Sequence, residues 1–216
     1  MPPKDDTVPA PKPGGACYHA IKRLFDSVFS LAVIIVLAIP LGILCLAIVI
    51  ESPGAPIFKQ RRIGQFGKPI YIFKLRTMVA DAHDHPEKYL SPEQYEEWKR
   101  EQKVENDPRI TRIGHVLRKT SLDELPQFLN VLKGELSVIG PRPVTEAETY
   151  EYGNARDLIL SIKPGITGWW QVTQRNNATW ENHERQMLEL FYVRHASLAL
   201  DARIFVRTFK AMGRGR

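Results

Sequence analysis

The chain opens with a polar segment, continues with one long apolar run and then alternates short apolar and charged stretches. No charged residue occurs from Ser27 to Ile50. As a helix, this run would extend roughly 36 Å, enough to cross a bilayer core of about 30 Å. The pattern predicts a membrane segment, and the lack of a small-residue cleavage site after it predicts that the segment stays on the mature protein.

Basic residues flank the apolar run on both sides: Lys22 and Arg23 precede it, and Lys59, Arg61, Arg62, Lys68 and Lys74 follow it. Basic flanks favour the cytoplasmic side of a membrane, so both ends prefer the same face. Pro40 lies near the middle and removes a helical hydrogen bond, so two arms of about 12 residues could enter and leave through one leaflet. Hydropathy alone favours the alternative, a straight or kinked spanning helix.

Shorter patterns predict the remaining elements. Residues 1–20 are expected to be a disordered tail, because their Pro- and Lys-rich start lacks apolar periodicity. Residues 57–76 predict two strands around a Gly-rich turn, with Tyr71, Phe73 and Leu75 on one face and Lys74 and Arg76 on the other, polar face. Residues 92–103 predict a charged, solvated helix.

An adjacent acidic pair, Asp123 and Glu124, is the first candidate for chemistry. Ser121 and Glu124 have the spacing of a capping box, and apolar residues at helical spacing follow until Gly134. Acidic residues in a first helical turn are favoured without any catalysis, so capping alone would explain the pair. Basic residues nearby in the sequence, Arg118, Lys119 and Arg142, add a capacity to bind phosphate beside a helix amino terminus.

Two further segments each have two interpretations. Residues 201–216 place Arg203, Arg207, Lys210 and Arg214 on one helical stripe, opposite Phe205, Phe209 and Met212. This pattern is typical of a helix in the membrane interface, and equally of a surface helix packed on its domain. The run from Asp81 to His85 resembles metal ligands only superficially, and an exposed turn is the expected structure.

Composition narrows the class of protein. The chain has 216 residues and a formal charge of +6, which suits an anionic partner such as nucleic acid, anionic lipid or a nucleotide-sugar. The apolar run makes a nucleic-acid protein the weakest of these alternatives. Two cysteines give neither a disulfide framework nor a cysteine metal site, which indicates a reducing compartment. The expected fold is a compact, mostly helical α+β unit with a small β-hairpin.

Several motifs together resemble one family, the bacterial sugar transferases or monotopic phosphoglycosyl transferases. The resemblance extends from Lys22 to about Met212. Its motifs are Lys59-Gln60-x-Arg62-x-Gly64, Phe73-Lys74-x-Arg76-Thr77-Met78, Leu117 to Gln127, Asn130 to Gly134, Gly140-Pro141-Arg142-Pro143 and Lys163-Pro164-Gly165-Ile166-Thr167-Gly168-x-Trp170-Gln171-Val172.

The resemblance implies a two-step transfer of a sugar-1-phosphate from a UDP-sugar to undecaprenyl (polyprenyl) phosphate, with Mg²⁺ as cofactor and UMP as product. Asp123 would be the nucleophile and Glu124 would help to handle the metal or acceptor, so both are the implied catalytic and metal-binding residues. Phosphate and substrate contacts are assigned to Arg118 and Arg142 and, more weakly, to Lys59, Arg62, Lys74, Arg76 and Gln171. Such a reaction would initiate exopolysaccharide or glycoconjugate synthesis.

The resemblance also implies a location. Residues 21–51 would form a re-entrant membrane helix hairpin broken at Pro40, although Ile39 stands where the family often has Ser. Residues 52–216 would form the catalytic domain at the cytoplasmic face of the bacterial inner membrane, with an interfacial C-terminal helix. The chain would be a short form without the transmembrane helices of longer relatives.

The sequence leaves the sugar, the oligomeric state and the class of protein open. The residues around Tyr89 to Lys103 resemble an insertion found in members that transfer galactose or glucose phosphate. A homo-oligomer is compatible with the sequence. The competing class is a non-catalytic, membrane-tethered basic module that binds anionic lipid or a polysaccharide-assembly partner; replacing Asp123 discriminates the two, because only an enzyme would lose turnover.

Overall fold

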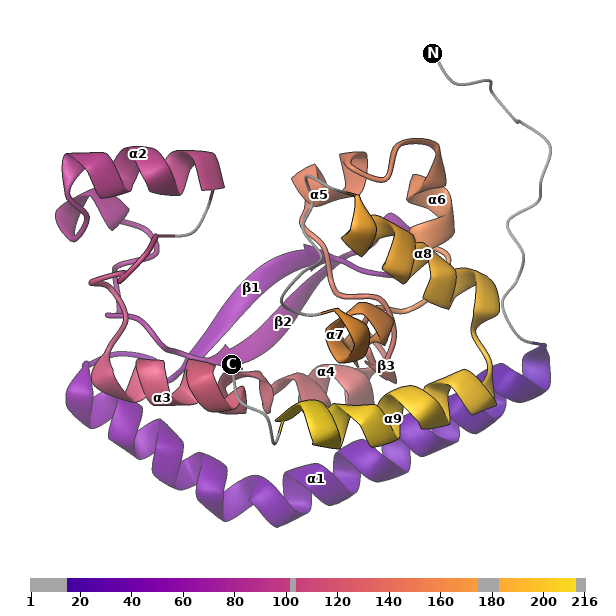
Figure 1. Cartoon of the computed structure of the whole chain (residues 1–216). Helices are drawn as coiled ribbons and strands as arrows, with labels where there is room; N and C mark the ends of the chain where they lie inside the picture. The colour runs from indigo at the N-terminus through magenta and orange to yellow at the C-terminus, as the bar shows by residue number, and fades with distance from the viewer. Residues whose placement is uncertain (1–14, 102–103, 175–182, 213–216) are drawn as a thin grey trace. The chain divides into compact units, whose positions relative to one another are not determined.

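The computed structural model of the chain describes residues 15–101, 104–174 and 183–212, as a mostly helical α+β fold with two small sheets (Figure 1). Its first half contains α1 (Ala16–Glu51), β1 (Ile57–Ile63), β2 (Pro69–Leu75), α2 (Pro92–Glu101) and α3 (Arg112–Thr120). The second half contains α4 (Gln127–Lys133), β3 (Ser137–Ile139), α5 (Glu146–Tyr150), α6 (Arg156–Ile159), β4 (Gly165–Thr167), α7 (Trp169–Thr173), α8 (Glu184–His195) and α9 (Leu198–Met212).

The chain divides into two compact units. Unit 1 consists of the described parts of Met1–Ile34, Gln60–Ile72 and Gln127–Arg214. Unit 2 consists of Ile35–Lys59 and the described part of Phe73–Pro126. Helix α1 and the β1–β2 hairpin therefore contribute residues to both units, and each unit has its own apolar core.

The core of unit 1 is built from short segments, which lie against the N-terminal part of α1. Buried apolar residues come from strands β1 to β3, from helices α4, α6, α8 and α9 and from the loops between them, with Leu136, Tyr192, Val193 and Ile204 almost inaccessible to solvent. The ring of Phe205 on α9 lies 5.4 Å from that of Phe25 and 5.1 Å from that of Phe29, between centroids. Aromatic contacts thus hold α9 along the start of α1, as Figure 1 shows.

Strands β3 and β4 form a parallel pair with Ser137 opposite Gly165 and Ile139 opposite Thr167. Gly140 follows β3, and Gly165 begins β4. A Cβ atom on Gly165 would lie 2.1 Å from the backbone nitrogen of Gly140, which real side chains do not tolerate. The two glycine-containing motifs of the sequence are therefore adjacent, and their glycines allow the two backbones to touch.

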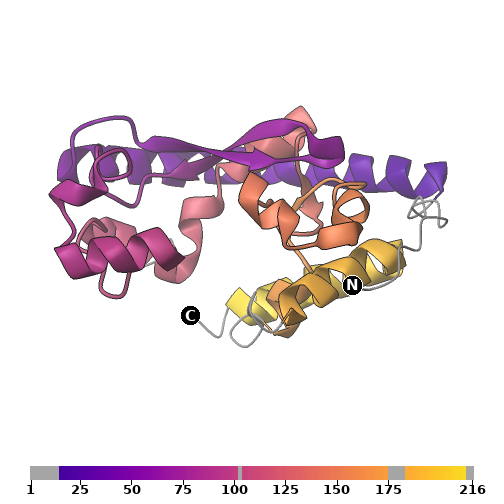
Figure 2. The same ribbon diagram turned by 90° about the horizontal axis from the view of Figure 1, so that it is seen from above.

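Unit 2 packs around Ile48 of α1, Leu75 of β2 and Leu117 of α3. Helix α3 is capped by the Thr111 hydroxyl, and the carboxylate of Glu51 accepts the backbone N–H groups of Arg112 and Ile113 at 2.9 and 3.1 Å. Helix α2 lies at the edge of unit 2 in both views (Figures 1 and 2). The expectation of a charged, solvated helix from residue 92 is confirmed, to the end of the described part at Glu101.

Helix α1 runs without interruption from Ala16 to Glu51 and includes Pro40. Among the described residues it is the one helix long and apolar enough to cross a membrane, judged by length and composition alone, and its most apolar window is only 6% buried. Its exposed apolar residues include Leu24, Val28, Leu31, Ile35, Val36, Ile39, Ile43, Leu46 and Ile50. The re-entrant course of this segment stays a prediction.

The structure differs in part from three expectations based on the sequence. The disordered tail cannot extend to residue 20, because α1 begins at Ala16; residues 1–14 lie outside the described residues. The two strands around the Gly-rich turn are confirmed, but Arg76 is buried rather than part of a polar face. The C-terminal helix is present as α9, in which Phe205 packs on α1; Arg214 lies beyond the described residues.

We predict that Gly114→Ala destabilises unit 2. A Cβ atom at this first-turn position of α3 would lie 2.0 Å from the carbonyl oxygen of Thr77, so α3 and the segment after β2 would have to separate. Thermal unfolding of the detergent-solubilised chain should show a midpoint lower by roughly 5 °C or more.

The matched control is Gly42→Ala in α1, where a Cβ atom meets nothing within 4 Å. Alanine is the better helix former by about 1 kcal/mol, so this change should leave the midpoint unchanged or slightly raised. Equal midpoints for the two variants would show that the close approach at Gly114 is unimportant.

Candidate functional site

Asp123 and Glu124 lie on a short 3₁₀ turn, Leu122–Glu124, between α3 and α4. Ser121 ends α3 in the left-handed conformation, with φ of 59°, and its side chain makes no capping hydrogen bond. The expected capping box is therefore wrong. Helix α4 starts only at Gln127, because Pro126 has no N–H and suits the position just before a first turn. Gly134, with φ of 82°, ends α4 as expected.

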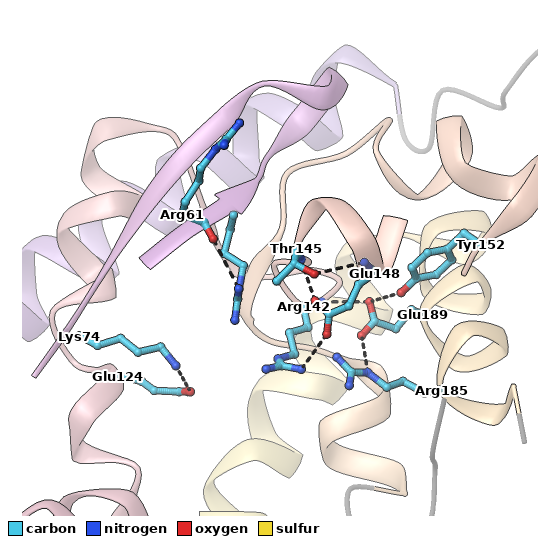
Figure 3. Close-up of polar contacts among 10 residues, drawn as sticks. Arg61, Lys74, Glu124, Arg142, Thr145, Glu148, Tyr152, Arg185 and Glu189 are labelled. Carbon is cyan, nitrogen blue, oxygen red and sulfur yellow. Dashed lines mark hydrogen bonds and ion pairs between the residues drawn. The ribbon is translucent and has the colours of Figure 1, made fainter. Parts of the chain in front are cut away.

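Cationic side chains of unit 2 lie near this turn. Lys74 Nζ on β2 is 3.4 Å from Glu124 Oε1, in a half-exposed ion pair (Figure 3). Arg118, on the last turn of α3, donates from Nε to the Thr77 hydroxyl at 2.9 Å. Asp123 is half-buried and its Oδ1 atom is shielded from solvent. A carboxylate pair beside a lysine and an arginine can bind both a metal ion and phosphate.

The other two predicted ligands in unit 2 have different surroundings. Lys59 is exposed on β1. Arg76 is buried, and its guanidinium donates to the carbonyl oxygens of Ser52, Pro53 and Gly54 at the end of α1. Through these bonds Arg76 holds the segment that follows α1. Its assignment as a substrate ligand stays a prediction, as does that of Lys59.

In unit 1, Arg142 lies in the loop after β3. Its backbone N–H donates to Glu189 Oε2 at 3.0 Å, and its guanidinium Nη1 lies 3.9 Å from Glu148 Oε1 (Figure 3). Glu148 also forms a capping box with Thr145 at the start of α5. The hydrogen bond to Glu189 therefore fixes the backbone of Arg142. Its guanidinium forms a long, half-exposed ion pair with Glu148.

Two more arginines join this cluster. Arg62 of β1 and Arg185 of α8 interact electrostatically with Arg142 and with Glu148. Burial lowers the pKa of both arginines. The Arg185 guanidinium also lies over the ring of Trp170, 4.6 Å from its centroid. Three guanidinium groups that converge in one unit form an arrangement suited to a polyanion.

Gln171 is next to Trp170 on α7. Its Nε2 donates to the Ile166 carbonyl at 3.1 Å, and its Oε1 is buried without a hydrogen-bond partner among the described residues. A buried acceptor of this kind can receive a hydrogen bond from a ligand. Lys74, Arg118, Asp123 and Glu124 thus belong to unit 2, and Arg62, Arg142 and Gln171 to unit 1.

Sequence reasoning missed Arg185 and Glu189. Both occupy α8 and were outside the quoted motifs, yet they share a helical stripe with the buried Tyr192 and Val193. The available signal was their spacing, which places two charged residues at core positions of the helix. Buried charges are rare unless they are paired, so this spacing could have predicted a buried ion pair. Glu189 is 1% exposed, less than any other buried carboxylate among the described residues.

Burial raises the pKa of Glu189 to about 7, against the lowering effect of Arg185 and Arg142 and of the hydrogen bond from Arg142. Glu148 raises it further, and the Tyr152 hydroxyl faces the same carboxylate at 3.5 Å. The group is therefore partly protonated near neutral pH. Its charge, and hence the field around Arg142 and Arg185, changes across that range.

Metal binding was also expected of the acidic pair. Among the described residues, no group of three or more His, Cys, Asp or Glu side chains is arranged to hold a metal ion. Mg²⁺ commonly takes only one or two protein carboxylates together with waters and substrate phosphates, so Asp123 and Glu124 are a donor set of the right kind. Asp81, in the other acidic segment, instead accepts hydrogen bonds from Lys88 and Tyr89.

These features define a mostly helical α+β protein with one long apolar helix, an acidic turn beside cations and a cluster of arginines. Residues 17–215 match the family described as bacterial sugar transferases. The chain belongs to this family.

Relatives with descriptive names support the match. The chain is 43% identical to the UDP-galactose-lipid carrier transferase of Erwinia amylovora, over 87% of this chain and 39% of the relative. It is 42% identical to the exopolysaccharide production protein ExoY of Rhizobium meliloti, over 88% of this chain and 84% of the relative. It is 38% identical to the UDP-glucose:undecaprenyl-phosphate glucose-1-phosphate transferase of Escherichia coli, over 88% of this chain and 40% of the relative.

We predict a pH-dependent stability effect of Glu189→Gln. Because the folded-state pKa is raised above the ordinary 4.5, ionisation opposes folding. The wild type should lose stability as pH rises from 4.5 through 7, by roughly 3 kcal/mol at about 1.4 kcal/mol per pKa unit. The neutral variant should lack this decline.

The comparison is made by thermal unfolding of both proteins at a series of pH values between 5 and 8. Glu148→Gln, which changes a half-exposed carboxylate of the same cluster, is the matched control. Parallel pH profiles for the wild type and Glu189→Gln would contradict the titration of Glu189.

Proposed function

We propose that the protein transfers a sugar-1-phosphate from a UDP-sugar to undecaprenyl phosphate, at the start of exopolysaccharide or glycoconjugate synthesis. The observation that carries this proposal is the family match across residues 17–215, which includes the acidic turn, Arg118 and Arg142. Relatives with matching sequences are named for this reaction with galactose or glucose as the sugar.

The proposed reaction has two displacements at one phosphorus atom. In the first, a carboxylate oxygen of Asp123 bonds to the sugar-bearing phosphorus, the bridging P–O bond breaks and UMP leaves. In the second, a phosphate oxygen of undecaprenyl phosphate attacks that phosphorus and the Asp123 carboxylate leaves. Aspartate suits both steps, because it is ionised at neutral pH and its acyl phosphate is a good phosphoryl donor.

Charge stabilisation is the main task of the surrounding side chains in phosphoryl transfer. Lys74 and Arg118 are the cations of unit 2 assigned to the phosphates, and Arg62 and Arg142 are those of unit 1. Gln171, with its buried Oε1, is assigned to substrate binding. The long ion pairs of Lys74 and Arg142 support this assignment, since such pairs exchange readily for a phosphate.

Asp123 and Glu124 are the proposed Mg²⁺ ligands. When bound, the ion would neutralise charge on the phosphoryl oxygens. Glu124 lies beside Lys74, so a lysine and a carboxylate are available to orient the same phosphate and its ion.

For the membrane, we propose that α1 enters and leaves the cytoplasmic leaflet of the inner membrane, with both units at the cytoplasmic face. Basic residues on both sides of the apolar run and Pro40 within it support this course. Both substrates then meet at the same face, because nucleotide-sugars are soluble and undecaprenyl phosphate is a lipid.

The decisive test is Mg²⁺-dependent release of UMP. The detergent-solubilised chain is supplied with undecaprenyl phosphate and a panel of UDP-sugars. One sugar should yield UMP, chelation of Mg²⁺ should abolish the release, and Asp123→Asn should lower it by about 10³-fold or more because the nucleophile is lost.

Asp84→Asn is the matched control, since it makes the same change at an exposed aspartate of unit 2. It should retain wild-type release. Absence of UMP with every sugar, in wild-type protein shown to be folded, would reject the enzyme and favour the non-catalytic tethered module.

The proposed course of α1 can be tested through a native thiol. Cys17 is exposed on the first turn of α1. If α1 re-enters, a membrane-impermeant maleimide should label Cys17 only after spheroplasts are lysed, because both ends of α1 face the cytoplasm. Labelling is read by the mass of the purified chain.

Cys17→Ser supplies the control, since it leaves only Cys45 within the apolar run. A maleimide-reactive residue placed in the periplasm on a second protein shows that the reagent reaches that side. Labelling of Cys17 in intact spheroplasts would establish a spanning helix instead.

A further inference from the structure

Three basic residues with no assigned role in the transfer lie at one cavity of unit 1. They are the basic pair at the start of α1 and the lysine that begins the Lys163 to Gly168 motif. The cavity has a volume of about 190 Å³, and its lining includes Lys22, Arg23, Asp26, Gln65, Ser137 and Lys163. This volume is enough for a phosphate group and several waters.

Some of the polar residues that line the cavity already pair with a carboxylate of α9. Lys22 Nζ lies 2.7 Å from Asp201 Oδ2, in an ion pair with little exposure. The hydroxyls of Tyr18 and Tyr192 donate to the same carboxylate at 3.0 and 2.7 Å. This network ties the first turns of α1 to α9 and leaves its members little capacity for a ligand.

Two other cationic residues, Arg23 and Lys163, also line the cavity. Arg23 donates to the carbonyl oxygens of Val131 and Leu132, at 2.6 and 2.8 Å, at the end of α4. Lys163 Nζ has no hydrogen-bond or ion-pair partner among the residues that the structure describes. A Cβ atom built on Gly134 would lie 3.6 Å from Lys163 Nζ and 3.7 Å from Arg23 Nη2, so both cations converge over this glycine.

The charges around the cavity do not balance. Lys22, Arg23 and Lys163 are cationic, and Asp26 and Asp201 are anionic, which leaves one positive charge. Burial lowers the pKa of Lys163, and Arg23 lowers it further, while Asp26 acts in the opposite direction. A half-buried ammonium group beside a guanidinium is stabilised in its charged form by an anion in the same cavity.

The cavity lies where α1 changes from charged to apolar residues. Asp26 is the last charged residue before the uncharged run from Ser27 to Ile50. On the outer side of the same turns, Leu24 is 66% and Val28 is 61% exposed. If this apolar face is buried in a bilayer, the polar turns of α1 and their cavity lie at the level of the lipid headgroups.

We propose that this cavity binds the phosphate group of a membrane phospholipid, with Lys163 as the principal ligand and Arg23 beside it. The site goes beyond the transfer reaction, because no bond of this lipid forms or breaks. Its occupant would fix the depth and rotation of α1 through contacts with the cavity rather than through apolar burial alone.

Binding is measured by isothermal titration of the detergent-solubilised full chain with three probes: dihexanoyl-phosphatidylglycerol, dihexanoylglycerol and inorganic phosphate. The phospholipid should bind saturably and at least tenfold more tightly than either other probe. Equal binding of dihexanoylglycerol would show that the phosphate is not recognised. Equal binding of inorganic phosphate would assign the cavity to a soluble anion and overturn the lipid assignment.

The variant Lys163→Gln should weaken phospholipid binding by about tenfold or more, the effect expected from losing one charge-assisted hydrogen bond. Lys68→Gln removes an exposed lysine of the same unit outside the cavity and should bind as the wild type. Lys163→Arg keeps the charge and should restore most of the affinity, which separates ligand binding from a folding defect. Equal affinity of Lys163→Gln and Lys68→Gln would overturn the proposal.

No UDP-sugar or undecaprenyl phosphate is present in this titration. Its result is therefore independent of UMP release, and either hypothesis can fail alone. A chain that transfers sugar phosphate but does not distinguish the three probes would lack only the lipid site.

Discussion

Two buried carboxylates hold the segment on which the arginine cluster of unit 1 depends. Asp26 of α1 accepts the backbone N–H of Val138 within β3, and Glu189 of α8 accepts that of Arg142 in the loop after this strand. Burying a carboxylate costs several kcal/mol unless hydrogen bonds compensate, so these two bonds favour the position of each helix that allows them. A strand of three residues, too short to be stable by itself, is thereby held at its middle residue, and the loop that follows it is held at Arg142.

Helix α1 combines two environments in one element. Its first turns carry Lys22, Arg23 and Asp26, which bind α9, α4 and β3 through specific polar contacts. Its later turns are apolar, and many of their side chains are exposed. The polar turns therefore fix the helix to unit 1, and the apolar turns supply the surface that a bilayer would cover. The polar contacts therefore decide which side of the first turns of α1 is covered by unit 1 and which side stays exposed.

The sequence predicted the features that depend on local pattern. The long apolar helix, the hairpin around Gly64 to Gly67, the end of α4 at Gly134 and the family motifs all follow from spacing and residue type. It failed where a partner distant in sequence decides the outcome. Arg76 is buried because it donates to three carbonyls just after α1, and Ser121 ends α3 in the left-handed conformation instead of capping the next helix. Glu189 was missed because its partners, Arg142 and Tyr152, lie far away in the chain.

Ion-pair geometry separates structural charges from those available to a ligand. In unit 2, Asp107 and Arg109 form a 2.7 Å pair that is almost fully buried, whereas Lys74 and Glu124 are 3.4 Å apart and half-exposed. Breaking the first would leave an uncompensated buried charge and cost about 3 to 5 kcal/mol, but half-exposed pairs contribute only about 0 to 1 kcal/mol. Arg142 and Glu148 in unit 1, at 3.9 Å, belong to the second kind. A phosphate can therefore displace the carboxylate partners of Lys74 and Arg142 at little cost, while the buried pair of Asp107 and Arg109 stays in place.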